Sequence, residues 1–402
     1  MSKLLAPGAL AGLRVVEMGQ LIAGPFVGKT LGEFGADVIK IEPPGAGDPL
    51  RNWRLLKQGT SVWWQVQSRN KRSLALDLRQ KEGQDIARQL IAQADVLVEN
   101  FRPGTLEKWG MGWEELSKLN PGLVMLRISG YGQSGPYRDL PGFGSIGEAM
   151  GGLRHLTGET GRVPVRCGIS IGDTLAALHG TIGVLTALYH RKVNGGQGQV
   201  IDVALHEAVF NVMESLVPEY SAFGVVREPA GSALPGIAPS NAYRCSDGGV
   251  VLIAGNGDSI FKRLMTAIGR DDLVDDSSLA DNAGRVKRVD ELDAAIEAWT
   301  LQHPTEAVLQ VLGEVGVPVG RAYTAKDIVE DPHYRARDMI LTQQTRDGYE
   351  VEVPGIVPKL LGTPGTVRSS APRVGDDTDG VLSEMGFTSQ DIASLRYRKV
   401  VA

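Results

Sequence analysis

Short hydrophobic runs alternate with stretches of helical periodicity along the first half of the chain. The runs are rich in β-branched and aliphatic residues, a composition that favours buried strands. We predict strands at Leu13–Met18, Val38–Glu42, Val96–Asn100, Val124–Ser129 and Gln199–Val203. Because helices are predicted between most of these strands, the pattern indicates a mostly parallel sheet covered on both faces.

The pattern changes at 229–239, where PAGSALPGIAP has the composition of a linker. Beyond it we predict a strand at Val250–Ala254, helices at 260–268 and Thr305–Glu314, and a last helix at the capping-box sequence that begins with Thr388.

These elements predict an α/β fold with a Rossmann-like parallel sheet in a large domain, and a smaller α/β domain beside it. The large domain is expected at 1–224 and is completed by a C-terminal return at 325–402, with the small domain at 225–324. A chain of 402 residues fits this division, because one hydrophobic core rarely serves so many residues.

Composition and charge narrow the classes of partner. The formal net charge of −5 disfavours nucleic acid, whose binding needs a concentrated basic face. Cys167, Cys245 and the six histidines show no metal-ligand spacing, so we expect no metal site and a reducing compartment. The nearly uncharged stretch Thr174–Tyr189 is shorter than the roughly 20 residues that cross a bilayer and is interpreted as a buried helix. We expect a cytoplasmic protein without a membrane partner.

Two glycine motifs suggest nucleotide binding. Residues 23–30, AGPFVGKT, fit a relaxed phosphate loop, but Pro25 removes a backbone N–H and Phe26, Val27 and Leu31 share a helical face. The sequence GFGSIG at 142–147 matches GxGxxG but follows a proline-containing loop instead of a strand. We disfavour both interpretations.

Asp173 is the most informative acidic residue. It stands after GISIG at the start of a long apolar helix. Spacing alone favours an N-cap, an ordinary role for aspartate. The functional alternative is a carboxylate at a helix N-terminus that flanking glycines leave open to substrate.

Several basic residues follow predicted strands, where an open α/β sheet binds anionic ligands. Each one alone is better explained as a solvated side chain, but together they indicate a phosphate-bearing ligand. They are Lys71, Arg72, Arg79, Arg102 and Lys108.

Motifs along the whole chain resemble the class III coenzyme A-transferases, the family of formyl-CoA and carnitine-CoA transferases. They are GLRVVEMGQLIAGPFVGKTLGEFGADVIKIEPPGAGD, NKRSLALDL, ADVLVENFRPGTLEKWGM, RISGYGQSGP, GISIGD, GVPVGRAY and VGDDTDGVLSEMGF, in the family's order. The resemblance implies that Asp173 is a nucleophile that forms covalent intermediates with acyl-CoA esters. It further implies an interlocked homodimer, with coenzyme A esters as substrates and no permanently bound cofactor.

The resemblance also implies the other site residues. Gln20, Phe143 and Gly144 fall on substrate positions. The positions that hold the adenine and phosphates of CoA are occupied by Leu21, Ala23, Leu76, Arg79, Asn100, Phe101, Arg102 and Lys108. Pro43 and Pro141 stand where formyl-CoA transferase has basic residues, so the phosphate contacts differ there.

The leading hypothesis is therefore a CoA-transferase that moves CoA from an acyl-CoA, with succinyl-CoA as the first donor to try, to a small carboxylic acid. Glutarate, itaconate, malate or an acid bearing a sulfinate or sulfonate are the candidate acceptors. The alternatives are an acyl-CoA racemase of the same fold, which Phe143 disfavours because it cannot transfer a proton, and a phosphate-loop protein.

Overall fold

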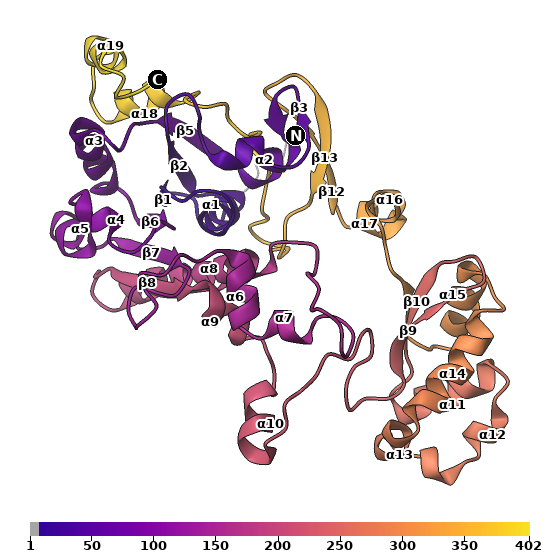
Figure 1. Ribbon diagram of the computed structural model, residues 1–402. Helices are drawn as coiled ribbons and strands as arrows, with labels where there is room; N and C mark the ends of the chain where they lie inside the picture. Colours follow the sequence, from indigo (N-terminus) through magenta and orange to yellow (C-terminus); the bar gives the residue numbers. More distant parts are fainter. Residues whose placement is uncertain (1–7) are drawn as a thin grey trace. The chain divides into compact units, whose positions relative to one another are not determined.

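The computed structural model describes residues 8–402, which divide into two units (Figure 1). The larger unit comprises residues up to 154, 166–223 and 335–402, and the smaller comprises 155–165 and 224–334. The small unit therefore extends beyond the predicted end at 324. It also takes in 155–165 because this segment binds the linker: Gly231 N donates to Gly158 O at 2.9 Å, and Thr160 Oγ1 donates to Pro229 O at 2.6 Å.

A six-stranded, wholly parallel sheet forms the centre of the larger unit, as predicted. In sheet order the strands are β5 (Lys71–Ala75), β2 (Asp37–Glu42), β1 (Arg14–Glu17), β6 (Val96–Glu99), β7 (Val124–Ser129) and β8 (Gln199–Ala204). Numbered along the chain, this is the order 3-2-1-4-5-6 of the Rossmann fold. The order reverses between β1 and β6, and such a switch point leaves a crevice beyond the ends of the strands.

Alternate residues of the strands enter two hydrophobic cores, as the two-residue period of a strand requires. In β6, for example, Leu97 packs into one core, whereas Val96 and Val98 pack into the other. The first core is covered by α3 (Lys81–Ile91), α4 (Thr105–Lys108), α5 (Trp113–Leu119), α18 (Thr378–Glu384) and α19 (Ser389–Tyr397). The second is covered by α1 (Ala23–Glu33), α8 (Ile171–Val193) and α9 (Leu205–Phe210). The C-terminal return thus covers one face of the sheet.

Strand β5 was not predicted, although its sequence was noted. Its first residues, Lys71 and Arg72, hide the hydrophobic pattern because both are charged. Lys71 Nζ lies 2.7 Å from Glu17 Oε2, and Arg72 Nη2 lies 2.6 Å from Asp37 Oδ2 on the neighbouring strand. Because ion pairs within the fold already use both residues, the structure gives no support to the prediction that they attract a phosphate-bearing ligand.

The larger unit contains further short elements. They are a 3-10 turn (Pro49–Asn52), β3 (Leu56–Lys57), β4 (Thr60–Ser61), α2 (Val62–Gln67), α6 (Gly144–Met150), α10 (Leu216–Phe223), β12 (Ile340–Gln344) and β13 (Glu350–Pro354). Two helices, α7 (Leu153–Leu156) and α17 (Pro332–Ala336), lie where the chain passes from one unit to the other.

The smaller unit has its own core beneath an antiparallel sheet of β9 (Ser240–Arg244), β10 (Val250–Ala254) and β11 (Val319–Arg321). Its helices are α11 (Asp258–Ala267), α12 (Asp271–Val274), α13 (Asn282–Lys287), α14 (Val289–Thr300), α15 (Thr305–Glu314) and α16 (Ala325–Glu330), with a 3-10 turn at Ser277–Leu279.

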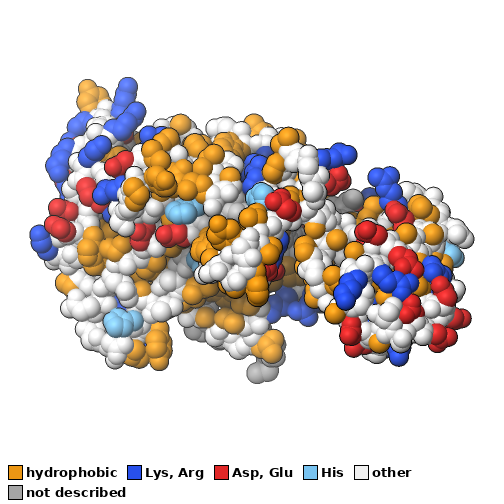
Figure 2. Space-filling model, turned by 60° about the horizontal axis from the view of Figure 1, so that its bottom comes forward, with side chains coloured by type: hydrophobic (Ala, Val, Ile, Leu, Met, Phe, Trp, Pro, Cys, Tyr) orange, Lys and Arg blue, Asp and Glu red, His pale blue; other side chains and the backbone are white. Residues whose placement is uncertain are grey.

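Helix α8 is longer than the uncharged stretch that predicted it, and it is not a wholly buried helix. Small residues such as Ala176 and Gly180 face the sheet, while large apolar side chains face outward. By length and composition α8 could cross a membrane, a test that core helices of soluble proteins also pass. Figure 2 shows one face of the structure, on which hydrophobic side chains lie in several patches between polar and charged ones. The exposed apolar residues of α8 are Leu178, Ile182, Leu185, Tyr189 and Val193.

A cluster of fully buried charges lies at the end of β1. Lys40 Nζ contacts Glu17 Oε1 at 2.9 Å and Asp48 Oδ2 at 2.8 Å, and Lys71 pairs with the other oxygen of Glu17. These carboxylates raise the pKa of Lys40 against the effect of burial, whereas burial lowers the pKa of Lys71 to about 8. We call Glu17, Lys40, Asp48 and Lys71 the buried charge cluster.

We predict that Glu17→Gln lowers the apparent free energy of unfolding by roughly 3–5 kcal/mol, because the amide leaves two buried ammonium groups short of a counter-charge. Urea denaturation followed by circular dichroism measures the change. The control is Lys81→Gln, which removes an exposed ion pair with Asp85 and is expected to cost less than about 1 kcal/mol. An equal loss in the two variants would contradict the prediction.

Candidate active site

The loop after β1 crosses the switch point of the sheet and contacts the loop after β6. Gln20 N donates to Asn100 Oδ1 at 2.7 Å, and Asn100 Nδ2 donates back to Gln20 O at 2.9 Å. The close approach needs Gly19, because a Cβ there would lie 3.1 Å from Asn100 Oδ1. Two residues predicted for the site are thus held together where an α/β sheet binds its ligand.

The buried charge cluster fixes the conformation of this loop. Lys40 Nζ donates to Gly19 O at 2.7 Å, and Asp48 accepts the backbone N–H of Leu21 at 3.1 Å. Leu21 has a φ of +63°, a conformation that non-glycine residues rarely adopt. The hydrogen bond from Leu21 N compensates for this strained backbone, so that Gln20 is presented to the crevice.

A cavity of about 350 Å³ opens beyond the carboxyl ends of β1, β2, β5 and β6. It brings together four of the predicted site residues, Gln20, Leu76, Arg79 and Phe101. Pro43, which stands where the resemblance implied a basic residue, lies in the same wall. Trp109, which had not been predicted, also lines the cavity. The centroids of the Trp109 and Phe101 rings lie 5.4 Å apart, in an edge-to-face arrangement. Aromatic and aliphatic walls of this kind suit the planar face of a base.

The other predicted CoA contacts lie around this cavity without lining it. Ala23 is buried in the first turn of α1, where only its backbone and methyl group are available. Arg102 and Lys108 are exposed on the segment that follows β6. Leu21 and Asn100 are partly buried in the loops described above.

Arg79 is less available to a ligand than the sequence suggested. Its side chain is 86% exposed, but its guanidinium binds Asp77 at 2.8 and 3.0 Å. These hydrogen bonds lower the pKa of Asp77 to about 2, so the pair stays ionised throughout the physiological range. A phosphate group must therefore compete with Asp77 for Arg79.

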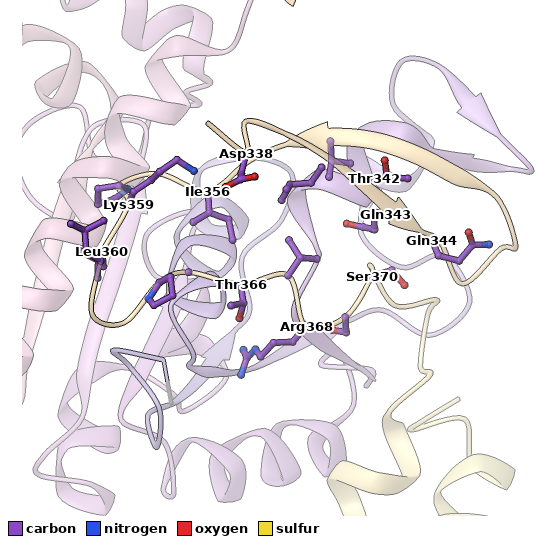
Figure 3. Close-up of a pocket in the computed structure, with 18 residues that line it drawn as sticks. Asp338, Thr342, Gln343, Gln344, Ile356, Lys359, Leu360, Thr366, Arg368 and Ser370 are labelled. Carbon is purple, nitrogen blue, oxygen red and sulfur yellow. The ribbon is translucent and has the colours of Figure 1, made fainter. Parts of the chain in front are cut away.

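A larger cavity of about 690 Å³ lies in the C-terminal return, lined by residues between 338 and 370 (Figure 3). None of the predicted site residues lines it. Arg368, one of its lining residues, donates to Gly32 O and Ala36 O and so attaches this segment to the end of α1. This cavity is therefore separate from the candidate active site.

Asp173 lies in the first turn of α8 but is not its N-cap, so the N-cap interpretation is wrong. The helix begins at Ile171, its N-cap is Ser170, and no side chain caps it. Because α8 returns the chain to a parallel strand, it runs antiparallel to the sheet, and its first turn lies at the edge where the strands end. Asp173 and Gln20 thus lie at the same edge of the sheet.

Two glycines allow the backbone to pack closely around Asp173. A Cβ on Gly144 would lie only 2.1 Å from Asp173 Oδ2, and a Cβ on Gly172 would lie 2.9 Å from Gly144 O. The GxGxxG match at 142–147 therefore serves close packing, with Gly144 opening α6 against the carboxylate. Phe143 is the N-cap residue of α6, and its side chain is exposed.

The sequence analysis missed Glu148 and Arg166, which act on Asp173, and Arg154, which binds Glu148. Glu148 is 1% exposed, its Oε2 lies 2.9 Å from Arg154 Nη2, and its Oε1 lies 3.8 Å from Arg166 Nη2. Burial, and secondly the charge of Glu148, raises the pKa of Asp173 to about 6, while Arg166 opposes the shift. No motif links these residues, because an ordinary helix face and a loop bring them together.

The phosphate-loop interpretation is excluded because residues 23–30 are all helical. Gly28 has a different purpose: a Cβ there would lie 1.9 Å from Glu17 Oε2, so glycine makes room for the buried charge cluster. Lys29 pairs with Glu33 at 3.2 Å. Within residues 8–402, no group of three histidine, cysteine, aspartate or glutamate side chains is arranged to hold a metal ion.

Comparison with known proteins places this geometry in a family. The chain is 47% identical to the succinyl-CoA–D-citramalate CoA-transferase of Chloroflexus aurantiacus over the full length of both proteins. It is 42% identical to the beta subunit of the succinyl-CoA–L-malate CoA-transferase of the same organism, with 98% of each chain covered.

Solved structures agree with this relationship. A CAIB/BAIF family protein from Brucella suis superposes with a TM-score of 0.84 and 34% identity, over 94% of this chain and 100% of that chain. The family model for CoA-transferase family III matches residues 10–378. The resemblance found in the sequence is thus confirmed: the chain is an enzyme that belongs to CoA-transferase family III.

Proposed function

We propose that this CoA-transferase moves CoA from succinyl-CoA to a small dicarboxylic acid through covalent intermediates on Asp173. The observation that carries the proposal is the partly buried carboxylate at the first turn of α8, which packs against Gly144 and lies at the edge of the sheet where Gln20 lies. Succinyl-CoA is the donor in the names of the two relatives from Chloroflexus, and D-citramalate and L-malate are dicarboxylic acids.

The reaction consists of two exchanges that mirror each other. An Asp173 oxygen attacks the thioester carbonyl of the donor, and CoA leaves as a thiolate, which yields a mixed anhydride. The thiolate then attacks the aspartyl carbonyl, so that Asp173 carries CoA as a thioester and the donor acid leaves as a carboxylate. The acceptor carboxylate attacks this thioester, which releases the CoA thiolate and yields a second anhydride, between the acceptor acid and Asp173. The thiolate then attacks the acceptor carbonyl of this anhydride, and the acceptor leaves as a CoA thioester. Asp173 is regenerated as a free carboxylate.

The cavity beyond β1, β2, β5 and β6 is proposed to hold the adenine end of CoA. Phe101, Trp109 and Leu76 would contact the base, and Arg79, Arg102 and Lys108 would attract the phosphates. A racemase is disfavoured because the exposed hydrocarbon side chain of Phe143 cannot exchange protons with a substrate.

We also propose that the enzyme is a homodimer, whose chains interlock as the family resemblance implied. The outward face of α8 carries large apolar residues in a continuous stripe, which is a feature of protein interfaces. Burial of this stripe against a second chain would remove it from water.

For Asp173→Asn we predict a loss of activity of several orders of magnitude with the fold intact, because an amide is not a nucleophile and Asp173 does not cap α8. CoA transfer is measured by mass spectrometry of the new thioester. Hydroxylamine added to the wild type with acyl-CoA should convert Asp173 to a hydroxamate. Asp379→Asn is the control, since Asp379 also lies in the first turn of a helix. An active Asp173→Asn enzyme, or trapping on another carboxylate, would refute the nucleophile.

The pH profile is predicted to follow the ionisation of Asp173. Its carboxylate attacks only when deprotonated, so kcat/KM for succinyl-CoA should fall as the pH drops through about 6 and be constant above about 7. Glu148→Gln removes a negative charge that raises the pKa of Asp173 and should move this limb to lower pH. A shift to higher pH would show that Glu148 does not act on Asp173 in this way.

Light scattering is predicted to give twice the chain mass of 43.0 kDa at micromolar concentration. Ile182→Lys places a charge on the stripe of α8 and should lower the midpoint of thermal unfolding, because the charge must be buried in the dimer. Leu119→Lys is the control on α5, at a side chain that is 55% exposed compared with 62% for Ile182. A wild-type monomer, or equal midpoints for the two variants, would count against the interface.

A further inference from the structure

Glu148 has a carboxylate oxygen that the fold leaves unused. The side chain is 1% exposed, and Oε1 has no hydrogen-bond partner among residues 8–402. A buried carboxylate oxygen without a donor is costly, so such an atom calls for a partner, which a ligand can supply. Glu148 Oε2 is in contrast bound by Arg154 at 2.9 Å, which fixes the orientation of the carboxylate.

Arg166 faces the same oxygen and is only loosely held. Its Nη2 lies 3.8 Å from Glu148 Oε1, which is too long for a hydrogen bond, and 3.4 Å from Ser170 Oγ. The side chain is 47% exposed, so a ligand can reach it, and its guanidinium group carries five N–H donors. A carboxylate acceptor and a guanidinium donor thus lie side by side.

Both groups border the nucleophile. Gly172, next to Asp173 in the chain, packs against Glu148, since a Cβ on Gly172 would lie 3.3 Å from Glu148 Cγ. Arg166 and Glu148 are also the two charged side chains that act on the ionisation of Asp173. A ligand that touches this pair is therefore close to the reacting carboxylate.

We propose that Glu148 and Arg166 form the acceptor subsite and recognise a 2-hydroxycarboxylate group, with the substrate hydroxyl donating to Glu148 Oε1 and the adjacent carboxylate binding Arg166. This inference rests on the proposed function and names its acceptor class, a 2-hydroxy dicarboxylic acid. The hydroxyl and the carboxylate of such a group are neighbours, as are the two side chains. The second carboxylate of the acid, remote from the hydroxyl, is then the one that reacts at Asp173.

The charges of the subsite change in step with the reaction. In the free enzyme the carboxylates of Asp173 and Glu148 balance the guanidinium groups of Arg154 and Arg166. Once Asp173 carries CoA as a thioester it is neutral, and the remaining three groups have a net charge of +1. The anionic acceptor is therefore attracted at the stage when it is needed, and this attraction weakens when Asp173 is released.

The test measures acceptor preference with succinyl-CoA as donor and wild-type enzyme. The acceptors are L-malate, D-malate, carbon-13-labelled succinate, which differs from malate only in lacking the hydroxyl, and butyrate, which has one carboxylate. We expect kcat/KM for one malate enantiomer to exceed that for succinate by roughly tenfold or more, the worth of a hydrogen bond to a charged group. The product should carry CoA on the carboxyl group remote from the hydroxyl, as determined by NMR.

Two variants separate the roles of the residues. In Glu148→Gln the amide oxygen of the glutamine should turn toward Arg154, because Arg154 can only donate hydrogen bonds. The NH2 group of the glutamine then takes the place of Oε1, so the acceptor for the substrate hydroxyl is lost. The preference for malate over succinate should then fall by roughly tenfold. Arg166→Met should raise KM for malate and succinate together, with little effect on butyrate. Arg396→Met on α19 is the matched control, with a side chain that is 43% exposed, and should change none of these values.

Several outcomes would overturn the subsite. They are a wild type that prefers succinate to both malates, a Glu148→Gln variant with an unchanged preference, an Arg166→Met variant that affects butyrate equally, and CoA on the carboxyl group beside the hydroxyl. If CoA still reaches succinate through a hydroxamate-forming Asp173, only this inference fails. If no acid accepts CoA and no hydroxamate forms, the proposed function fails as well.

Discussion

The desolvation of Lys40 is the constraint on which the rest of the site depends. An ammonium group removed from water must be compensated, and here Glu17, Asp48 and the carbonyl of Gly19 surround it. Because these partners lie on β1, on the loop after it and at the N-cap of the 3-10 turn Pro49–Asn52, their pairing determines the backbone path at the switch point. The same requirement explains Gly28 of α1, because a side chain at this position would clash with Glu17. The packing of α1 is thus linked, through Glu17 and Lys40, to the position of Gln20.

A second arrangement of charge, around Asp173, has the opposite character. Each charge of the buried charge cluster has an ion-pair partner within 3 Å, whereas Glu148 Oε1 has no hydrogen bond and lies 3.8 Å from the half-exposed Arg166. Buried charges that are fully paired make a rigid support. Buried charges that are incompletely paired lower the stability of the fold but remain able to bind a ligand. The two arrangements therefore have different roles. The buried charge cluster holds the loop that carries Gln20, and the charges around Asp173 shift the pKa of the carboxylate that is proposed to react.

The sequence predicted the helices and strands that are specified by the pattern of their own residues. Strands such as Val124–Ser129 and Val250–Ala254 have the predicted bounds, because continuous apolar runs specify them. Strand β5 was missed because its lysine and arginine are neutralised by residues distant in sequence. The same limit applied to the site: Asp173 followed from its position before an apolar helix, but Glu148 and Arg166 become neighbours only in three dimensions. Ion pairs between distant residues leave no periodicity to detect.

Helix α8 connects these levels of structure. Its glycine and alanine face allows the helix to approach β7 closely, since a Cβ on Gly180 would lie 2.9 Å from Leu126. The large apolar residues must then lie on the outer face, which favours a partner surface over solvent. The close approach also sets the height of the first turn above the strand ends, where Gly144 and Glu148 of α6 meet it. The packing that leaves an apolar stripe on the outer face of α8 is therefore the same packing that positions Asp173 in its first turn.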